Sequence, residues 1–316
     1  MEKTNLVTQY EELPIIYEKK THIGYSTIGK QGTLKIVSIM NFLQDTASEH
    51  ADLMGVSGFH LAKENLAWVI FRYHIDIKNH PKWQDRVAIQ TQRFSYKNLY
   101  EIRALTITQA QDDCLTKTKK EQKCLTNTQA QSKCLAHTGN EIVNAKVCWV
   151  MINKKNGKPV RLSKFMDKKM LESNQSIKAN YLIANSSQIV GSSPNNEGLE
   201  SYFPDIIKPE TIHYQLPFKV RMHDLDLNGH VNNAIFVEWG VETVPERIFS
   251  EFSPVTIDVI FNKESLYGDI IISHTEIREQ EGRLFTLHSI IRQQDQAELA
   301  RLNIYWQSLP ERVNQF

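Results

Sequence analysis

The sequence carries almost no excess charge of either sign. Lys and Arg number 37 and Asp and Glu number 36, so the formal net charge is +1. A balance this close creates no overall field that would attract nucleic acid. No uninterrupted apolar run reaches the roughly 20 residues that a membrane-spanning helix needs, and residues 1–12 are polar and acidic rather than a secretory or transit peptide. We therefore expect a cytoplasmic protein that neither spans a membrane nor binds nucleic acid.

Cysteine is also scarce, with four residues in the chain. Three of them recur every ten residues in a tandem repeat at about 112–141: Cys114, Cys124 and Cys134. With His137 they supply the ligand types of a zinc site, but the close cysteine pair typical of such sites is missing, so we predict no metal. Free thiols are favoured over disulfides in a chain without an export signal. The repeat is predicted to be an exposed insert in a hairpin.

No Gly-x-Ser-x-Gly segment occurs in the chain, which argues against the nucleophile elbow of many serine hydrolases. Groups able to do chemistry concentrate instead between Arg221 and Glu242. Four polar residues occupy every second position there: Asp224, Asp226, Asn228 and His230. In an extended segment such side chains project from one face. The pattern therefore predicts a strip carrying acid, amide and imidazole groups together.

A helix is predicted directly after this strip. Asn232 or Asn233 can cap it, and Pro245 ends the pattern. Its apolar stripe comprises Ile235, Phe236, Trp239 and Val241. The free backbone N–H groups at a helix start favour developing negative charge. The strip thus delivers its polar groups to a place suited to an anionic intermediate.

These residues resemble a known family. The run Asp-Leu-Asp-x-Asn-x-His-Val-Asn-Asn before an aromatic-rich helix is similar to the signature of the acyl-ACP thioesterases, plant and bacterial enzymes built from two hotdog domains. About thirty residues downstream, Ile257–Asp269 resembles the strand and turn that supply the last active-site carboxylate of that family. The resemblance implies hydrolysis of fatty acyl-ACP to free fatty acid, which terminates fatty acid synthesis.

The implied fold is α+β, with two tandem hotdog domains, each a long central helix wrapped by a curved antiparallel sheet. A chain of 316 residues with 41% hydrophobic content has room for two such domains. We expect an N-terminal domain at 1–153 that binds the acyl chain, a linker at 154–210 and a catalytic domain at 211–316. In the first domain Ser38 is predicted to cap a helix that reaches Met54, and strands are predicted at 67–77, 86–96 and 100–109.

The two halves can be aligned through their helices. Laying Phe42-Leu43-Gln44 on Phe236-Val237-Glu238 places residues without catalytic side chains opposite Asp226, Asn228 and His230; these are Gly32, Leu34 and Ile36. The first half would then repeat the fold without the chemistry and hold the acyl chain. The candidate residues of that acyl pocket are Met40, Leu43, Met54, Trp68 and Ile70.

The resemblance carries catalytic status onto four residues by motif match: Asp226, Asn228, His230 and Glu264. A thioester needs an activated water and donors for the oxyanion, but little acid help, because a thiol has a pKa of about 8.5 and leaves readily. We assign the activation of water to Glu264, assisted by His230, and the polarisation of the carbonyl to the Asn228 amide. Asp226 would orient His230 or Asn228. An exchange of roles between Asp226 and Glu264, including direct carboxylate attack, stays open.

Two neighbours of these residues are candidates for assisting roles, Ser265 and Asn232. Many plant members of the family carry Cys directly after the glutamate, where this chain has Ser265, so a cysteine nucleophile is not available there. Ser265 is expected to help by hydrogen bonding, and Asn232 is most simply a helix-start residue. Asp258, in a strand pattern nearby, is predicted to be exposed.

Acyl carrier protein is the expected partner. It is acidic, and a basic run after the first domain is a candidate docking surface: Lys154, Lys155, Lys158, Arg161 and Lys164. An ordinary solvated linker is an equally good interpretation of this run. No cofactor is expected, since the phosphopantetheine arrives as part of the substrate. The alternatives are a hotdog acyl-CoA thioesterase and a non-catalytic acyl-thioester-binding protein. Chain-length preference, and monomer or homodimer, stay open.

Overall fold

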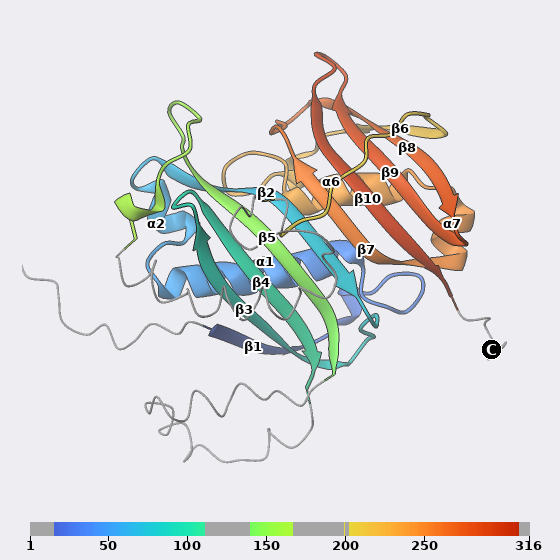
Figure 1. Cartoon of the computed structure of the whole chain (residues 1–316), viewed down its shortest axis with the longest axis horizontal. Helices are drawn as coiled ribbons and strands as arrows, with labels where there is room; N and C mark the ends of the chain where they lie inside the picture. Colours follow the sequence, from blue (N-terminus) through green and yellow to red (C-terminus); the bar gives the residue numbers. More distant parts are fainter. Residues whose placement is uncertain (1–15, 111–139, 167–198, 200–201, 310–316) are drawn as a thin grey trace, which may run out of the picture.

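The computed structural model describes residues 16–110, 140–166, 199 and 202–309. Within this part of the chain, ten strands form one antiparallel sheet (Figure 1). The strands of the first half are β1 (Ile16–His22), β2 (Leu66–Ile77), β3 (Arg86–Tyr96), β4 (Tyr100–Gln109) and β5 (Glu141–Asn153). Those of the second half are β6 (Tyr214–Lys219), β7 (Phe252–Phe261), β8 (Ile270–Gln280), β9 (Arg283–Arg292) and β10 (Glu298–Ser308). An α+β fold with an antiparallel sheet is confirmed.

The two halves of the sheet have the same strand order, read from the centre of the sheet to each edge. The order across the whole sheet is β1-β3-β4-β5-β2-β7-β10-β9-β8-β6, so the first five strands and the last five follow the same order outward from the centre. The halves meet where β2 pairs with β7, with Arg72 opposite Ile260 and Asp76 opposite Thr256. Continuous strand pairing across this junction makes one sheet of the two halves.

Two long helices cover one face of the sheet (Figure 1). Helix α1 (Ile36–Leu53) lies across the first half and α6 (Asn233–Glu242) across the second, and the two contact each other. Their apolar sides join residues of both halves in a single core. Burial on this scale, rather than helix propensity, stabilises the arrangement. The short helices α2 (Gly58–Ala62) and α7 (Glu246–Glu251) were not predicted.

Helix α1 begins earlier than predicted. Its N-cap is Lys35, and Ser38 lies in its first turn. The Lys35 N–H donates to the Thr27 carbonyl at 3.0 Å, and Ile36 already contributes to the core. The start is therefore set by the loop before the helix and by burial of Ile36, which outweigh the side-chain cap that Ser38 would offer.

The loops before α1 and α6 have the same backbone. The bridge between Ile28 and Leu34 matches the bridge between Leu225 and Val231, and the two turn glycines, Gly32 and Gly229, have φ angles of 76° and 78°. The same offset relates the hydrogen bond from Gly29 N to Thr33 O, 2.8 Å, to the bond from Asp226 N to His230 O, 2.7 Å.

This correspondence corrects the alignment of the halves. Asp226, Asn228 and His230 lie opposite Gly29, Gln31 and Thr33, not opposite the predicted Gly32, Leu34 and Ile36. The error is a shift of three residues, which an apolar helical pattern tolerates because positions three and four apart share a face. In these three places the first half carries one amide, Gln31, but no acid and no imidazole.

The predicted repeat insert lies outside the described residues as far as residue 139, with Cys114, Cys124, Cys134 and His137, and so does most of the predicted linker. Cys148 is buried with a free thiol. In the described ranges, no group of His, Cys, Asp and Glu has the arrangement of a metal site. None of the helices described there is long and apolar enough to cross a membrane.

A polar cluster lies at the junction of the two halves. His74 Nδ1 lies 2.6 Å from Asp258 Oδ1 and its Nε2 lies 3.0 Å from Asp76 Oδ2, while Thr256 donates to Asp76 at 2.9 Å. Asp258 is only 4% exposed, so the prediction of an exposed Asp258 is wrong. It is buried because the pairing of β2 with β7 brings His74 opposite it.

The junction should make stability depend on pH. Burial alone lowers the pKa of His74, but hydrogen bonds and charges from Asp258 and Asp76 outweigh it and raise this pKa to about 9. The stabilisation of the folded state by charged His74 is fully present below about pH 6.5 and is lost as the pH rises through about 9. Because the His74 side chain is only 15% exposed, this stabilisation is on the order of 3 kcal/mol. The free energies of urea unfolding of wild type and His74→Gln should therefore differ most at about pH 6 and converge near pH 10. A constant difference would contradict this assignment.

Candidate active site

The predicted polar strip is a turn and not an extended segment. A short 3-10 turn, Met222–Asp224, leads into it, and the chain reverses at Gly229, whose positive φ suits glycine. Asp224 is not grouped with the other polar residues of this strip. Its buried carboxylate accepts hydrogen bonds from Nε and Nη2 of the Arg221 guanidinium and from the Arg221 backbone N–H. The prediction of an extended strip was wrong because polar residues at every second position occur in turns as well as in strands.

The Asp226 carboxylate organises this turn. Its Oδ1 accepts the backbone N–H of Asn228 at 2.8 Å and of His230 at 3.2 Å. Asp226 thus positions both residues through their backbone and holds the side chains of Asn228 and His230 on a fixed loop. Its contacts are those of a positioning residue.

His230 and Glu264 form the chemically active pair of the site. His230 Nδ1 lies 3.3 Å from Glu264 Oε2, and their side chains are 33% and 62% exposed. The two loops are tied together where Val231 N donates to Ser265 O at 3.0 Å. A carboxylate and an imidazole at this distance, open to solvent, can together bind and deprotonate a water molecule.

Ser265 faces away from that pair. It is fully buried, and its hydroxyl donates to Asp269 Oδ2 at 2.8 Å. The same oxygen accepts the Leu266 N–H at 3.0 Å, and Arg292 lies 3.4 Å away. Burial raises the pKa of Asp269, but these hydrogen bonds outweigh it and lower the pKa overall. Ser265 therefore anchors the loop that carries Glu264.

The first residue of the predicted linker also reaches the site. Lys154, just after β5, donates from Nζ to Asn228 Oδ1 at 3.3 Å. With its oxygen held there, the Asn228 amide N–H₂ is free to face a substrate. Asn232 has a different role, since its Oδ1 accepts the Ala234 N–H at 3.0 Å and caps α6. No local pattern could link Lys154 to Asn228, because 74 residues separate them.

In the equivalent loop of the first half, the amide side chain is hydrogen-bonded to the protein. Gln31, opposite Asn228, donates to the Phe249 and Phe252 carbonyls at 2.8 and 3.0 Å, and its Oε1 accepts from Ser253. His80 stands opposite Glu264, because the bond from Leu34 N to Pro81 O matches that from Val231 N to Ser265 O. Burial lowers the pKa of His80. The amide in this loop is therefore committed to protein carbonyls.

The predicted acyl-pocket residues separate into two groups. Met40, Leu43 and Ile70 belong to the main core under the two helices. Met54 and Trp68 belong to a smaller cluster near α2, where Trp68 Nε1 donates to Val56 O at 2.8 Å. The second group approaches the loop of Asn228 through α2, where a Cβ added at Gly58 would stand 4.0 Å from Leu227 Cδ2. The main core reaches the end of the same loop at Val231.

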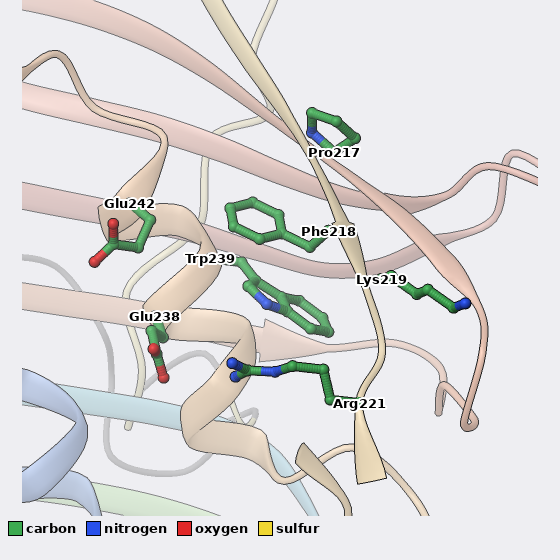
Figure 2. A pocket seen from close by; sticks show the side chains of 7 residues that line it. All are labelled: Pro217, Phe218, Lys219, Arg221, Glu238, Trp239 and Glu242. Carbon is green, nitrogen blue, oxygen red and sulfur yellow. The ribbon is translucent and has the colours of Figure 1, made fainter. Parts of the chain in front are cut away.

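A pocket of about 280 Å³ opens elsewhere, between β6 and α6. Figure 2 shows the Arg221 side chain extending toward Glu238 and Trp239 in this pocket. Burial raises the pKa of Glu238, against the charge of Arg221. None of the four predicted catalytic residues lines this pocket, so its location does not define the active site.

Comparison with known proteins identifies the family. The model described as the acyl-ACP thioesterase N-terminal domain matches residues 14–134, and the C-terminal domain model matches residues 207–308. The chain belongs to the acyl-ACP thioesterase family. The C-terminal match includes the loops of His230 and Glu264.

Curated relatives of this acyl-ACP thioesterase family member come from plants. The chain is 27% identical over 267 residues to an oleoyl-acyl carrier protein thioesterase from Arabidopsis thaliana, covering 82% of this chain and 62% of the relative. It is 23% identical over 269 residues to a dodecanoyl-[acyl-carrier-protein] hydrolase from Cinnamomum camphora, covering 83% and 60%. The chain thus spans less than two thirds of the length of these relatives.

Solved structures share the fold of the family. A 12:0-ACP thioesterase from Umbellularia californica superposes with a TM-score of 0.68 at 18% identity, covering 93% of this chain and 95% of that chain. An acyl-ACP thioesterase from Bacteroides thetaiotaomicron gives 0.64 at 18% identity, with coverages of 95% and 100%. At these identities the similarity establishes the fold alone.

Proposed function

We propose that this chain hydrolyses the thioester of fatty acyl-ACP, releasing free fatty acid and ending chain elongation. The proposal also makes 1–153 and 211–316 two tandem hotdog units joined by 154–210. One observation carries the activity: the His230–Glu264 pair, 3.3 Å apart, beside the Asn228 amide near the N-terminus of α6. Family membership and the plant relatives' names support it.

Glu264 is proposed as the base that activates water. Its carboxylate is exposed and faces His230, which orients the water or shares its proton. Asp226 is less suited to this role, since its Oδ1 is engaged by two backbone N–H groups. The geometry therefore favours Glu264 over Asp226 in the choice that the sequence left open.

The carbonyl oxygen is proposed to lie against the Asn228 amide, near the positive N-terminal end of the α6 dipole. Both stabilise the negative charge of a tetrahedral intermediate. The intermediate collapses by breaking the C–S bond, and the thiolate needs little help because a thiol has a pKa of about 8.5. The reaction requires no cofactor in the protein.

Acyl carrier protein is proposed to dock near Lys154. The basic residues Lys155, Lys158, Arg161 and Lys164 are exposed on the segment that follows β5. Lys154 connects this segment to Asn228, so an acidic carrier bound there would stand close to the site. Opposite charges would speed the encounter and fix its orientation.

Hydrolysis of matched acyl-ACPs and acyl-CoAs, from C8 to C18, tests the function and the docking together. We expect ACP substrates to be preferred. Lys158→Glu/Arg161→Glu should raise KM for acyl-ACP about tenfold, or about 1.4 kcal/mol, and leave acyl-CoA unchanged; Lys82→Glu, an exposed site on the first half, is the matched control. Equal turnover of both thioesters would indicate an acyl-CoA thioesterase instead. No turnover by folded protein would leave a non-catalytic acyl-binding protein.

A further inference from the structure

Three charged side chains are buried on the helix-facing side of the first half. Arg93 on β3 and Glu101 and Arg103 on β4 are 3%, 2% and 4% exposed. Arg93 Nη2 lies 2.6 Å from Glu101 Oε2, and Arg93 Nε also donates to Glu101. Arg103 Nη2 lies 3.6 Å from Glu101 Oε1, and its Nη1 lies 3.1 Å from His50 Nδ1. Buried ion pairs seldom add stability over apolar residues of similar size, so this cluster calls for another reason.

The charges border the smaller apolar cluster. Arg93 Nη1 lies 3.9 Å from Met54 Sδ, and its Nη2 lies 3.1 Å from Met166 Sδ. That cluster comprises Ala51, Met54, Val56, Leu61, Leu66, Met151, Leu162 and Met166, with Trp68 packed against it. Methionine side chains adapt their shape readily and can make room for a flexible apolar ligand.

The cluster and the charges follow one another across the sheet. Trp68 on β2 is opposite Met151 on β5, Trp149 on β5 is opposite Glu101 on β4, and the facing pair Arg93 and Arg103 joins β3 to β4. Residues directly opposite in an antiparallel pair share a face. With neighbouring strands about 4.8 Å apart, the charges on β4 begin about 10 Å from β2.

The apolar cluster, at the β2 end of this series of residues, lies next to the active site. Lys154 follows the strand of Met151 and reaches Asn228. Gly58, in the short helix after Met54, lies against the loop of the site, where an added Cβ would stand 4.0 Å from Leu227 Cδ2. The methionine-rich cluster therefore lies between the catalytic loop and the buried charges.

We propose that Arg93, Glu101 and Arg103 are specificity-determining residues that form a charged end wall for the acyl chain. This rests on the proposed function. An acyl chain that leaves the site enters the methionine-rich cluster, and its methyl end stops at the ions, because burying methylenes against them without replacing their hydrogen bonds is costly. The substrate class is an acyl-ACP whose chain ends before β4, and longer chains are rejected by this wall.

Arg93→Met tests the wall with the least disturbance. It removes the guanidinium that contacts Met54 and Met166 at the edge of the apolar cluster, and it leaves Glu101 and Arg103 as a pair of opposite charges. We expect the kcat/KM ratio of a chain two carbons longer than the wild-type optimum to rise about tenfold relative to that optimum, the effect of burying two more methylenes. Arg93→Lys, which keeps the charge, is the matched control and should keep the wild-type profile.

The triple variant Arg93→Met/Glu101→Leu/Arg103→Met removes all three charges and should shift the chain-length optimum further toward longer chains. It should still fold, because a buried ion cluster can be replaced by apolar residues of similar size. An unchanged chain-length profile in both folded variants, with a wild type that hydrolyses acyl-ACP, would overturn the wall and leave the function intact. A wild type that hydrolyses no thioester would overturn the proposed function, and the wall with it.

Discussion

Glu264→Gln is expected to lower kcat for acyl-ACP hydrolysis by a factor of about 10² to 10⁴, the usual contribution of a general base. The amide keeps the size of the side chain but cannot take a proton from water. Because Glu264 is 62% exposed, the substitution should leave the melting temperature nearly unchanged. KM should change little, since the carboxylate acts on the water rather than on binding of the acyl chain.

His230→Ala should lower kcat by a similar factor. The double variant Glu264→Gln/His230→Ala should be little less active than the less active of the two single variants, because the two residues act as one unit. His223→Ala is the matched control, as His223 is an exposed histidine in the same stretch, whereas the ion pair with Glu264 is made by His230. Retention of more than about a third of wild-type kcat by Glu264→Gln would place the base elsewhere, since a general base contributes far more.

Asp226→Ala is expected to lower kcat/KM by about 10²-fold for a different reason. Removal of the carboxylate leaves the Asn228 and His230 N–H groups without the oxygen that fixes them, so the side chains of both residues lose their positions. Two lost hydrogen bonds in a half-buried loop should also cost about 1 to 2 kcal/mol of folding stability.

Asp226→Asn separates positioning from chemistry. Its amide oxygen can still accept the same two N–H groups, so we expect it to recover most of the activity and stability that the alanine variant loses. Steady-state kinetics and thermal unfolding of both variants measure this. If Asp226→Asn is as inactive as Asp226→Ala while folding normally, Asp226 itself takes or donates the proton, and the exchanged roles are the correct ones.

Much of the sheet could be predicted from the sequence. Strands 86–96 and 100–109 have the predicted bounds, because β-branched and aromatic runs end at clear turn residues. The Asn232 cap is confirmed as well. In each case a local side-chain or backbone preference decides the structure.

What the sequence could not provide depends on contacts between distant segments. Ser38 was a suitable cap, but the helix start followed the bond from Lys35 to Thr27. The polarity of Asp258 predicts an exposed side chain, but strand pairing places it opposite His74. Lys154 reaches Asn228 from the segment that follows β5. The sequence motif predicts the four catalytic candidates. Their relative positions depend on turns and strand pairings that no local pattern encodes.

The two related loops offer the most direct test of where thioester hydrolysis takes place. Glu264 and His80 occupy equivalent positions, so Glu264→Gln and His80→Gln can be assayed side by side with wild type on the same acyl-ACP, measuring free fatty acid and carrier thiol. The site proposed here predicts release of both products by wild type, a loss of about 10² or more in Glu264→Gln, and activity near wild type in His80→Gln. Full activity in Glu264→Gln with loss in His80→Gln would contradict it.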